Sequence, residues 1–199
     1  MAGEVLPAVM VLRPLLGYVR ELLERVVQPG DVAIDGTIGN GHDMQFLAQR
    51  VGETGRVYGF DVQERALVKT REKLEEAGLL SPATLLQEDH ARMAECLPED
   101  VRGRVKAVMF NFGYLPGGDA SVVTTEATSI PALQAALELL APGGVITAML
   151  YRGHPEGKVE AEAVMAWAEG LELTQAHVLC YRFLNQKQDP PILLVVEKR

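Results

Sequence analysis

The chain has 199 residues, of which 48% are hydrophobic and 23% charged, and its net charge is −8 at pH 7. This length fits one domain with at most a small extension, and the composition is ordinary for a globular protein. No apolar run reaches the roughly 18–20 residues that cross a bilayer, and the first residues do not have the pattern of a signal peptide. The acidic balance argues against indiscriminate nucleic-acid binding but leaves room for a local basic patch.

The two cysteines, Cys96 and Cys180, lie in unrelated contexts. We interpret them as buried structural thiols in a reducing compartment, which predicts a cytoplasmic protein. Histidine, cysteine and acidic residues show no metal-ligand spacing, so we expect no metal site.

Leucine and valine recur at helical spacing between Leu12 and Val26, which predicts an amphipathic helix within an N-terminal segment, residues 1–29. Strands and helices then alternate. Ser129 is the expected N-cap of the helix that precedes Pro142. The expected strands cover residues 31–37, 56–62, 84–88, 105–112, 145–151, 176–184 and 192–197. The helices between them cover residues 43–51, 64–77, about 129–141 and 156–169.

This alternation predicts a parallel sheet with right-handed crossovers. The last two strands have no helix between them, so we expect them to form an antiparallel hairpin. The fold expected for residues 1–199 is therefore a single α/β domain of the Rossmann-like class I methyltransferase type. Its mostly parallel seven-stranded sheet would end in a C-terminal antiparallel hairpin and carry helices on both faces.

Glycines follow the first expected strand in the segment from Asp35 to Asp43, DGTIGNGHD. Gly39 and Gly41 allow a tight turn and a close approach to a ligand, and the helix beyond them offers free N–H groups. Asp61 ends the second strand, 61 − 39 = 22 positions after Gly39. A carboxylate at about this spacing can accept hydrogen bonds from ribose hydroxyls.

Other polar residues extend this predicted cofactor site. Gln63 could cover the ribose or adenine, and Asp89-His90 ends the third strand where a side chain usually contacts adenine. NAD competes for such a site, but Met44 stands where the third glycine of GxGxxG is expected. The polar segment suits a zwitterionic ligand, so we expect S-adenosylmethionine, with S-adenosylhomocysteine as product. A plain strand-to-helix turn is the alternative.

The fourth strand ends in Asn111-Phe-Gly-Tyr114. Enzymes that methylate exocyclic amines often place Asn or Asp, two prolines and an aromatic here, so the match is partial. Asn111 would orient the amine and Tyr114 would stack on its ring. The alternative is an asparagine that only satisfies backbone groups. The amine must be neutral to attack, and the candidate proton acceptors are Asp119, Tyr151 and His154. His154 could instead simply cap a helix.

These blocks resemble the YtqB-like (MnmM) family of rRNA methylase-like proteins, from about Arg13 to Lys198. The resemblance also rests on Phe60-Asp61-Val-Gln63, Tyr151-Arg-Gly-His-Pro-Glu-Gly-Lys158 and Asn185-Gln-Lys-Gln-Asp-Pro-Pro191. It implies N-methylation of aminomethyl-2-thiouridine to methylaminomethyl-2-thiouridine at the tRNA wobble position, and a homodimer. The cofactor contacts that it implies are Asn40, Asp43, Asp61, Gln63, Asp89 and His90.

On this basis we expect the tRNA anticodon loop to lie over the ends of the fourth and fifth strands. The expected phosphate contacts are Arg152, Lys158, Arg182 and Lys187, and Tyr114, Tyr151 or Tyr181 could stack on the base. The N-terminal helix could join the dimer interface or cover the sheet. The alternatives are a small-molecule amine methyltransferase of the same fold, a methyltransferase of another RNA such as rRNA, a non-catalytic binding module or an NAD enzyme.

Overall fold

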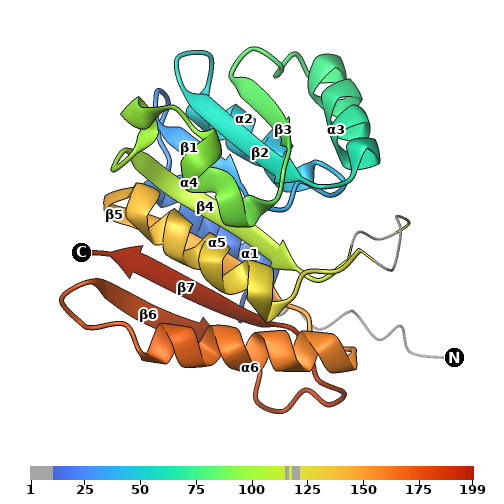
Figure 1. The fold of residues 1–199 in the computed structure, drawn as a ribbon, viewed down its shortest axis with the longest axis vertical. Helices are drawn as coiled ribbons and strands as arrows, with labels where there is room; N and C mark the ends of the chain where they lie inside the picture. The colour runs from blue at the N-terminus through green and yellow to red at the C-terminus, as the bar shows by residue number, and fades with distance from the viewer. Residues whose placement is uncertain (1–10, 115–116, 118–121) are drawn as a thin grey trace, which may run out of the picture.

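The structure is a computed structural model that describes residues 11–114, 117 and 122–199. It contains one seven-stranded sheet with the order β3-β2-β1-β4-β5-β7-β6 (Figure 1). All neighbouring pairs are parallel except those of β7, which runs antiparallel to both β5 and β6. The strands are β1 (Val32–Asp35), β2 (Arg56–Asp61), β3 (Ala83–Gln87), β4 (Val105–Phe112), β5 (Leu140–Leu150), β6 (Ala176–Tyr181) and β7 (Ile192–Lys198). The predicted fold class, including the C-terminal hairpin, is confirmed.

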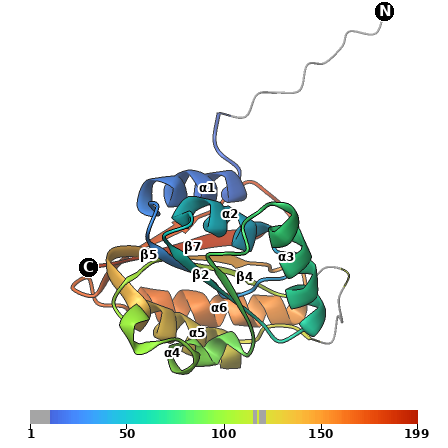
Figure 2. The ribbon, with the colours of Figure 1, turned by 90° about the horizontal axis from the view of Figure 1, so that it is seen from above.

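Helices cover both faces of the sheet, as Figure 2 shows for α1 and α2 on one side and α4, α5 and α6 on the other. The main helices are α1 (Leu15–Val26), α2 (His42–Val51), α3 (Glu64–Glu76), α4 (Met93–Cys96), α5 (Glu126–Leu139) and α6 (Pro155–Glu169), with short 3-10 turns η1 (His90–Arg92) and η2 (Glu99–Val101).

The apolar residues form two cores because the central strands are buried on both faces. One core packs α4, α5 and α6 on the sheet around Phe110 and Phe112, and the other packs α1, α2 and α3 around Leu23 and Leu47. Near-continuous apolar strands are typical of parallel sheets covered by helices. α1 buries Val19 and Leu23 in this second core, so it covers the sheet.

Three details differ from the sequence prediction. The N-cap of α5 is Thr125, which forms a capping box with Thr128, and the predicted cap Ser129 lies inside the helix. β5 begins at Leu140 and not at residue 145 as expected. Pro142-Gly143-Gly144 lies inside the strand and causes an irregularity in its pairing with β4. The short helices η1, α4 and η2 were not predicted, because they are too short to show the helical spacing of apolar residues.

The cysteines also differ from expectation. Both are free, but Cys96 is only partly buried and Cys180 is exposed on β6. β6 forms an edge of the sheet, and four of its six residues are exposed. The Cys180 side chain therefore does not pack in either core. Within the described residues, no helix has the length and apolar character needed to cross a membrane.

Ser129 has a different role from the predicted one. Its hydroxyl donates a hydrogen bond to Glu160 of α6, which is 1% exposed and also accepts a hydrogen bond from the Thr124 side chain. Burial raises the pKa of Glu160 above its usual value. Because Thr124 also accepts the Gly113 N–H at 2.7 Å, this carboxyl group supports the loop that follows β4.

The raised pKa of Glu160 predicts a pH-dependent stability. Between the unfolded and folded pKa values the folded state holds more protons, so the wild type loses stability as the pH rises through that window. Glu160→Gln keeps an acceptor for Ser129 and cannot ionise. We expect the unfolding free energy of the variant to rise relative to that of the wild type as the pH increases above the usual pKa of a glutamate. Urea denaturation at several pH values checks this, and a constant difference would contradict it.

Candidate active site

A cleft of about 970 Å³ opens at the carboxyl ends of the strands. The chain runs outward from β1 through β2 to β3 on one side and from β4 onward on the other, and ligands bind at such a switch point in open α/β sheets. The cleft brings together most of the predicted site residues. Those that line it are Gly39, Asn40, Asp43, Asp61, Gln63, Asp89, His90, Asn111, Tyr114, Tyr151, Arg152 and His154.

The glycine loop between β1 and α2 is held to β2 by Asp61. The carboxylate accepts the Gly39 N–H at 2.9 Å and the Gln63 N–H at 2.9 Å. Gly39 has φ +52° and Gly41 has φ +73°, a conformation that side chains disfavour. A Cβ at Gly41 would also lie 2.4 Å from the Thr70 hydroxyl. The turn therefore favours glycine at both positions, and the contact with Thr70 requires it at Gly41.

Two lysines of α3 hold the tip of this loop. Lys69 donates to the side-chain oxygen of Asn40 at 2.7 Å, and Lys73 donates to its carbonyl oxygen at 2.7 Å. Burial lowers the pKa of Lys73, with a further contribution from the neighbouring Lys69. The predicted cofactor residue Asn40 is thus fixed by both its side chain and its backbone.

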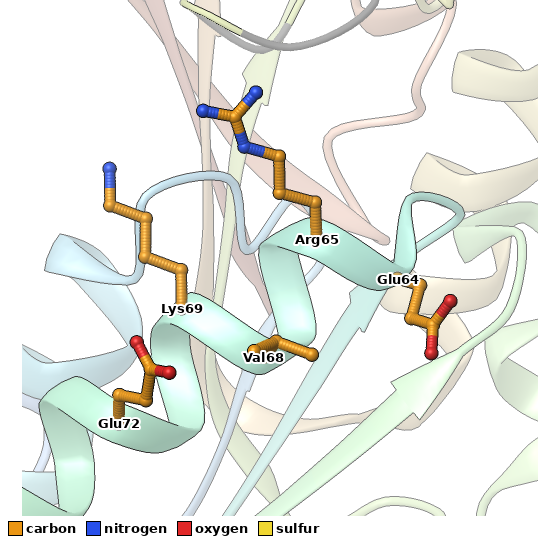
Figure 3. Close-up of a pocket in the computed structure, with 5 residues that line it drawn as sticks. All are labelled: Glu64, Arg65, Val68, Lys69 and Glu72. Atoms are coloured by element: carbon orange, nitrogen blue, oxygen red, sulfur yellow. The ribbon is translucent and has the colours of Figure 1, made fainter.

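A smaller pocket of about 460 Å³ lies on the surface of α3 (Figure 3). Arg65 and Lys69 extend from the same side of the helix in this view. Arg65 donates to the Gly117 carbonyl at 2.6 Å, in the loop after β4. The two cations of this pocket therefore contact the two loops that border the cleft.

The buried carboxyl group of Asp35 lies at the start of the glycine loop. Burial, followed by the charge of Asp43, raises the pKa of Asp35 well above its usual value, and the Asp35 carboxylate accepts the Thr37 N–H at 3.1 Å. Asp35 does not line the cleft. Its predicted cofactor role is thus better described as support for the loop.

His90 lines the cleft at the end of β3. Burial lowers the pKa of His90, so the ring is neutral at pH 7. Its Nδ1 lies 3.0 Å from the Gly36 carbonyl oxygen and must carry the proton that is shared with it. The other nitrogen, Nε2, is then a buried acceptor with no partner in the described chain. A ligand that donates a hydrogen bond would satisfy it.

Asp43 joins the glycine loop to the predicted amine site. The Asn111 side-chain amide donates to its carboxylate at 2.7 Å, and the Asn111 backbone N–H donates to the Thr37 hydroxyl at 2.7 Å. Because the amide nitrogen is engaged, the amide oxygen of Asn111 is the atom left to accept from a ligand. Burial and the charge of Asp43 raise the pKa of Tyr151, which lines the same cleft.

His154 caps α6. Its Nδ1 accepts the Gly157 N–H at 3.0 Å, so the neutral ring carries its proton on Nε2 and can donate there but not accept. Its ring centroid lies 6.2 Å from that of Tyr114. The capping interpretation of His154 is confirmed, and the geometry favours a positioning role over proton acceptance. Asp119, another predicted catalytic residue, lies outside the described residues.

The predicted RNA contacts are not all at the cleft. Asp189 pairs with Lys158 at 2.7 Å and with Arg152 at 3.8 Å. Arg182 and Lys187 are exposed and do not line the cleft. Tyr181 also lies outside it, where its ring stacks on Tyr18 at 4.9 Å and its hydroxyl donates to the Arg13 carbonyl at 2.7 Å.

Sequence reasoning missed the contribution of α1. Leu16, Val19 and Arg20 line the cleft. Arg20 comes four residues after Leu16 and three before Leu23, so a cation on an apolar helix face was the available signal. Asp189 also lines the cleft and was not among the predicted contacts.

The strand order, the antiparallel β7 and the glycine loop joined to an acidic residue at the end of β2 define a class I methyltransferase that uses S-adenosylmethionine. A family model described as "Putative rRNA methylase" matches residues 57–197. The chain belongs to this family.

Individual relatives agree with this assignment. A protein of Arabidopsis thaliana named "tRNA (mnm(5)s(2)U34)-methyltransferase, chloroplastic" is 38% identical over 184 residues. The match covers 88% of this chain and 66% of the relative, so the chain spans slightly under two thirds of that protein.

Two solved structures are similar over nearly the whole chain. A "putative rRNA-methylase" from Clostridium thermocellum is 40% identical with a TM-score of 0.91, and 96% of this chain and 100% of that one are covered. A "putative methyltransferase" from Streptococcus mutans in complex with SAH is 37% identical with a TM-score of 0.84, at the same coverage.

The contacts of Asp61 predict that Asp61→Ala abolishes most cofactor binding. The variant loses the predicted ribose acceptor and also frees the Gly39 N–H, and each charge-assisted hydrogen bond is worth on the order of 1.5–3 kcal/mol. We expect the affinity for S-adenosylhomocysteine, measured by calorimetry, to fall at least about tenfold. Asp100→Ala, which removes an exposed carboxylate paired with Arg56, should bind as the wild type does. Undiminished binding by Asp61→Ala would refute the assignment.

Proposed function

We propose that this protein is an S-adenosylmethionine-dependent N-methyltransferase of tRNA. Its substrate would be the aminomethyl group of the modified wobble uridine, and its product methylaminomethyl-2-thiouridine. The name of the Arabidopsis relative supports this substrate. The observation that carries the proposal is the Asn111–Asp43 hydrogen bond, because it presents an amide oxygen to an amine beside the cofactor loop.

The residues present fit the cofactor. The cleft lies at the upper end of the range of small-molecule sites, which leaves room for a base beside a nucleoside. Asp61 would accept the ribose hydroxyls, Gln63 and Asp89 would border the nucleoside, and the free Nε2 of His90 would accept from the adenine amino group. When bound, the cofactor supplies an electrophilic methyl group on a sulfonium.

The chain's own residues orient the acceptor. The amide oxygen of Asn111 would accept one N–H of the neutral amine, so that the nitrogen lone pair points into the cleft. Tyr114 is 54% exposed and Tyr151 is 40% exposed at the cleft, and either ring could stack on the displaced uridine. Much of the acceleration would come from this positioning. The loop that carries Tyr114 would be held by Thr124 and His154.

The anticodon loop would lie across the rim formed by the ends of β4 and β5. Arg182 and Lys187 have exposed side chains that could contact phosphates directly. Arg152 and Lys158 would exchange Asp189 for a phosphate oxygen, which makes their contribution smaller than that of unpaired cations.

A homodimer and a cytoplasmic location remain part of the proposal. On the edge strand β6, Val178 is 39% exposed and Leu179 is 45% exposed. An edge strand with apolar side chains favours pairing with a second chain. The cytoplasm would supply the tRNA substrate.

The substrate is tested by mass spectrometry of tRNA nucleosides. With the purified protein and S-adenosylmethionine, we expect tRNA that carries aminomethyl-2-thiouridine to gain one methyl group. Cells that lack the protein should accumulate the unmethylated nucleoside. Methylation of rRNA or of a free amine while this tRNA stays inert would contradict the proposal.

The role of Asn111 is tested by two substitutions. Asn111→Ala removes the amine acceptor, and Asn111→Asp places a second carboxylate against Asp43, whose repulsion disrupts the geometry. We expect kcat to fall by about a hundredfold or more in both, since misplacement of a reacting group is that costly. The affinity of Asn111→Ala for S-adenosylhomocysteine should stay within about threefold of wild type. If this variant lost the cofactor but kept turnover at saturation, the assigned roles would be wrong.

A further inference from the structure

The N-terminal helix places a cation in the cofactor cleft. The Arg20 guanidinium lies 3.8 Å from the Asp43 carboxylate and 4.8 Å from the centre of the Phe46 ring. Its side chain is 46% exposed, so part of the group remains open to a ligand. The contact with Phe46 orients the planar group, because a guanidinium stacks well on an aromatic face.

The cleft is otherwise strongly acidic. Its lining includes the carboxylates of Asp43, Asp61, Glu88, Asp89 and Asp189. This environment favours the sulfonium and the ammonium of S-adenosylmethionine but opposes the carboxylate of its amino-acid end. That carboxylate therefore needs a cation among the lining residues.

The other candidates among the described lining residues are neutral, engaged, or placed away from the glycine loop. Arg152 follows β5, two strands away from β1 and its glycine loop, and stands 3.8 Å from Asp189. Burial lowers the pKa of His90. Nδ1 of His42 lies 3.1 Å from the Lys73 ammonium and accepts from it, and Nδ1 of His154 accepts from the Gly157 N–H. Arg20 is the cation beside the glycine loop, because its partner Asp43 stands in the first turn of α2, and the distance of 3.8 Å between them is longer than that of a strong charged hydrogen bond.

We propose that Arg20 binds the carboxylate of the cofactor's methionine moiety and that Asp43 accepts a hydrogen bond from its ammonium. This rests on the proposed use of S-adenosylmethionine. The positive charge of Arg20 would face the carboxylate of the zwitterion, and the negative charge of Asp43 would face its ammonium. With the ribose at Asp61, the amino-acid end extends along the glycine loop toward Asp43 and α1.

Contacts at both ends of α1 hold Arg20 in place. At its start, Tyr181 stacks on Tyr18 and donates to the Arg13 carbonyl. At its end, Arg50 of α2 donates to the carbonyls of Glu24 and Val27 at 2.8 and 2.9 Å. Figure 2 shows α1 lying beside α2 on the same face of the sheet. Arg20 therefore belongs to the fixed wall of the cleft.

The test compares two ligands that share a nucleoside. S-Adenosylhomocysteine carries the amino-acid end, and 5′-methylthioadenosine lacks it. Arg20→Met removes the charge and keeps an apolar stem on Phe46. By calorimetry we expect this variant to bind S-adenosylhomocysteine about 10- to 100-fold more weakly and 5′-methylthioadenosine as the wild type does. Arg20→Lys, which keeps a charge without the planar fork, should lie between the two. Arg25→Met, on the exposed side of the same helix and paired with Glu21, is the matched control.

Decarboxylated S-adenosylmethionine isolates the carboxylate. The wild type should prefer S-adenosylmethionine to this analogue, and Arg20→Met should lose most of that preference. Two results would overturn the role of Arg20. In one, both Arg20 variants lose the same affinity for S-adenosylhomocysteine and for 5′-methylthioadenosine; in the other, neither ligand binds more weakly to them than to the wild type. A wild type that binds neither S-adenosylmethionine nor S-adenosylhomocysteine would instead overturn the proposed cofactor.

Discussion

The carboxylate of Asp43 is the constraint on which the site depends. It stands at the start of α2, where the free N–H groups of the helix favour a negative charge. From there it accepts the Asn111 amide and pairs with Arg20. One side chain therefore couples three segments that are distant in the sequence: the first helix, the glycine loop and the end of β4. A shift of α2 would displace the glycine loop and the Asn111 amide together.

This coupling concentrates negative charge. Asp35, Asp43 and Asp61 lie close enough that the charges of the other two raise the pKa of Asp35. Backbone donors offset part of the repulsion, through Thr37 at Asp35 and through Gly39 and Gln63 at Asp61. Lys69 and Lys73 add positive charge at the outer side of the loop. An acidic cleft with cations behind it suits a ligand that carries a sulfonium and an ammonium.

The sequence predicted the sheet and the glycine loop after β1 because both follow local rules. Apolar runs separated by amphipathic helices specify parallel strands, and Gly39, Gly41 and Asp61 meet because parallel strands end at one edge of a sheet. Residues whose role depends on packing between distant elements were not predictable in this way. Arg20 reaches the cleft only because α1 packs on the sheet beside α2. The pairing of Asp189 with Lys158 requires the loop before β7 to lie against α6. The Ser129–Glu160 hydrogen bond was not predictable for the same reason. The sequence around a serine near the start of a helix does not distinguish a helix cap from a hydrogen bond to a buried acid on another helix.

The position of β7 affects how the chain can fold during synthesis. Strands β1 to β4 pair only with strands that end at or before Leu150, whereas β5 and β6 both pair with β7, which follows them in the sequence. Until Ile192–Lys198 leaves the ribosome, β5 has an open edge and β6 has no strand beside it. Open edges of this kind invite aggregation. This half of the sheet can therefore assemble only after Ile192–Lys198 has been made, and it depends on the insertion of this short apolar segment between β5 and β6.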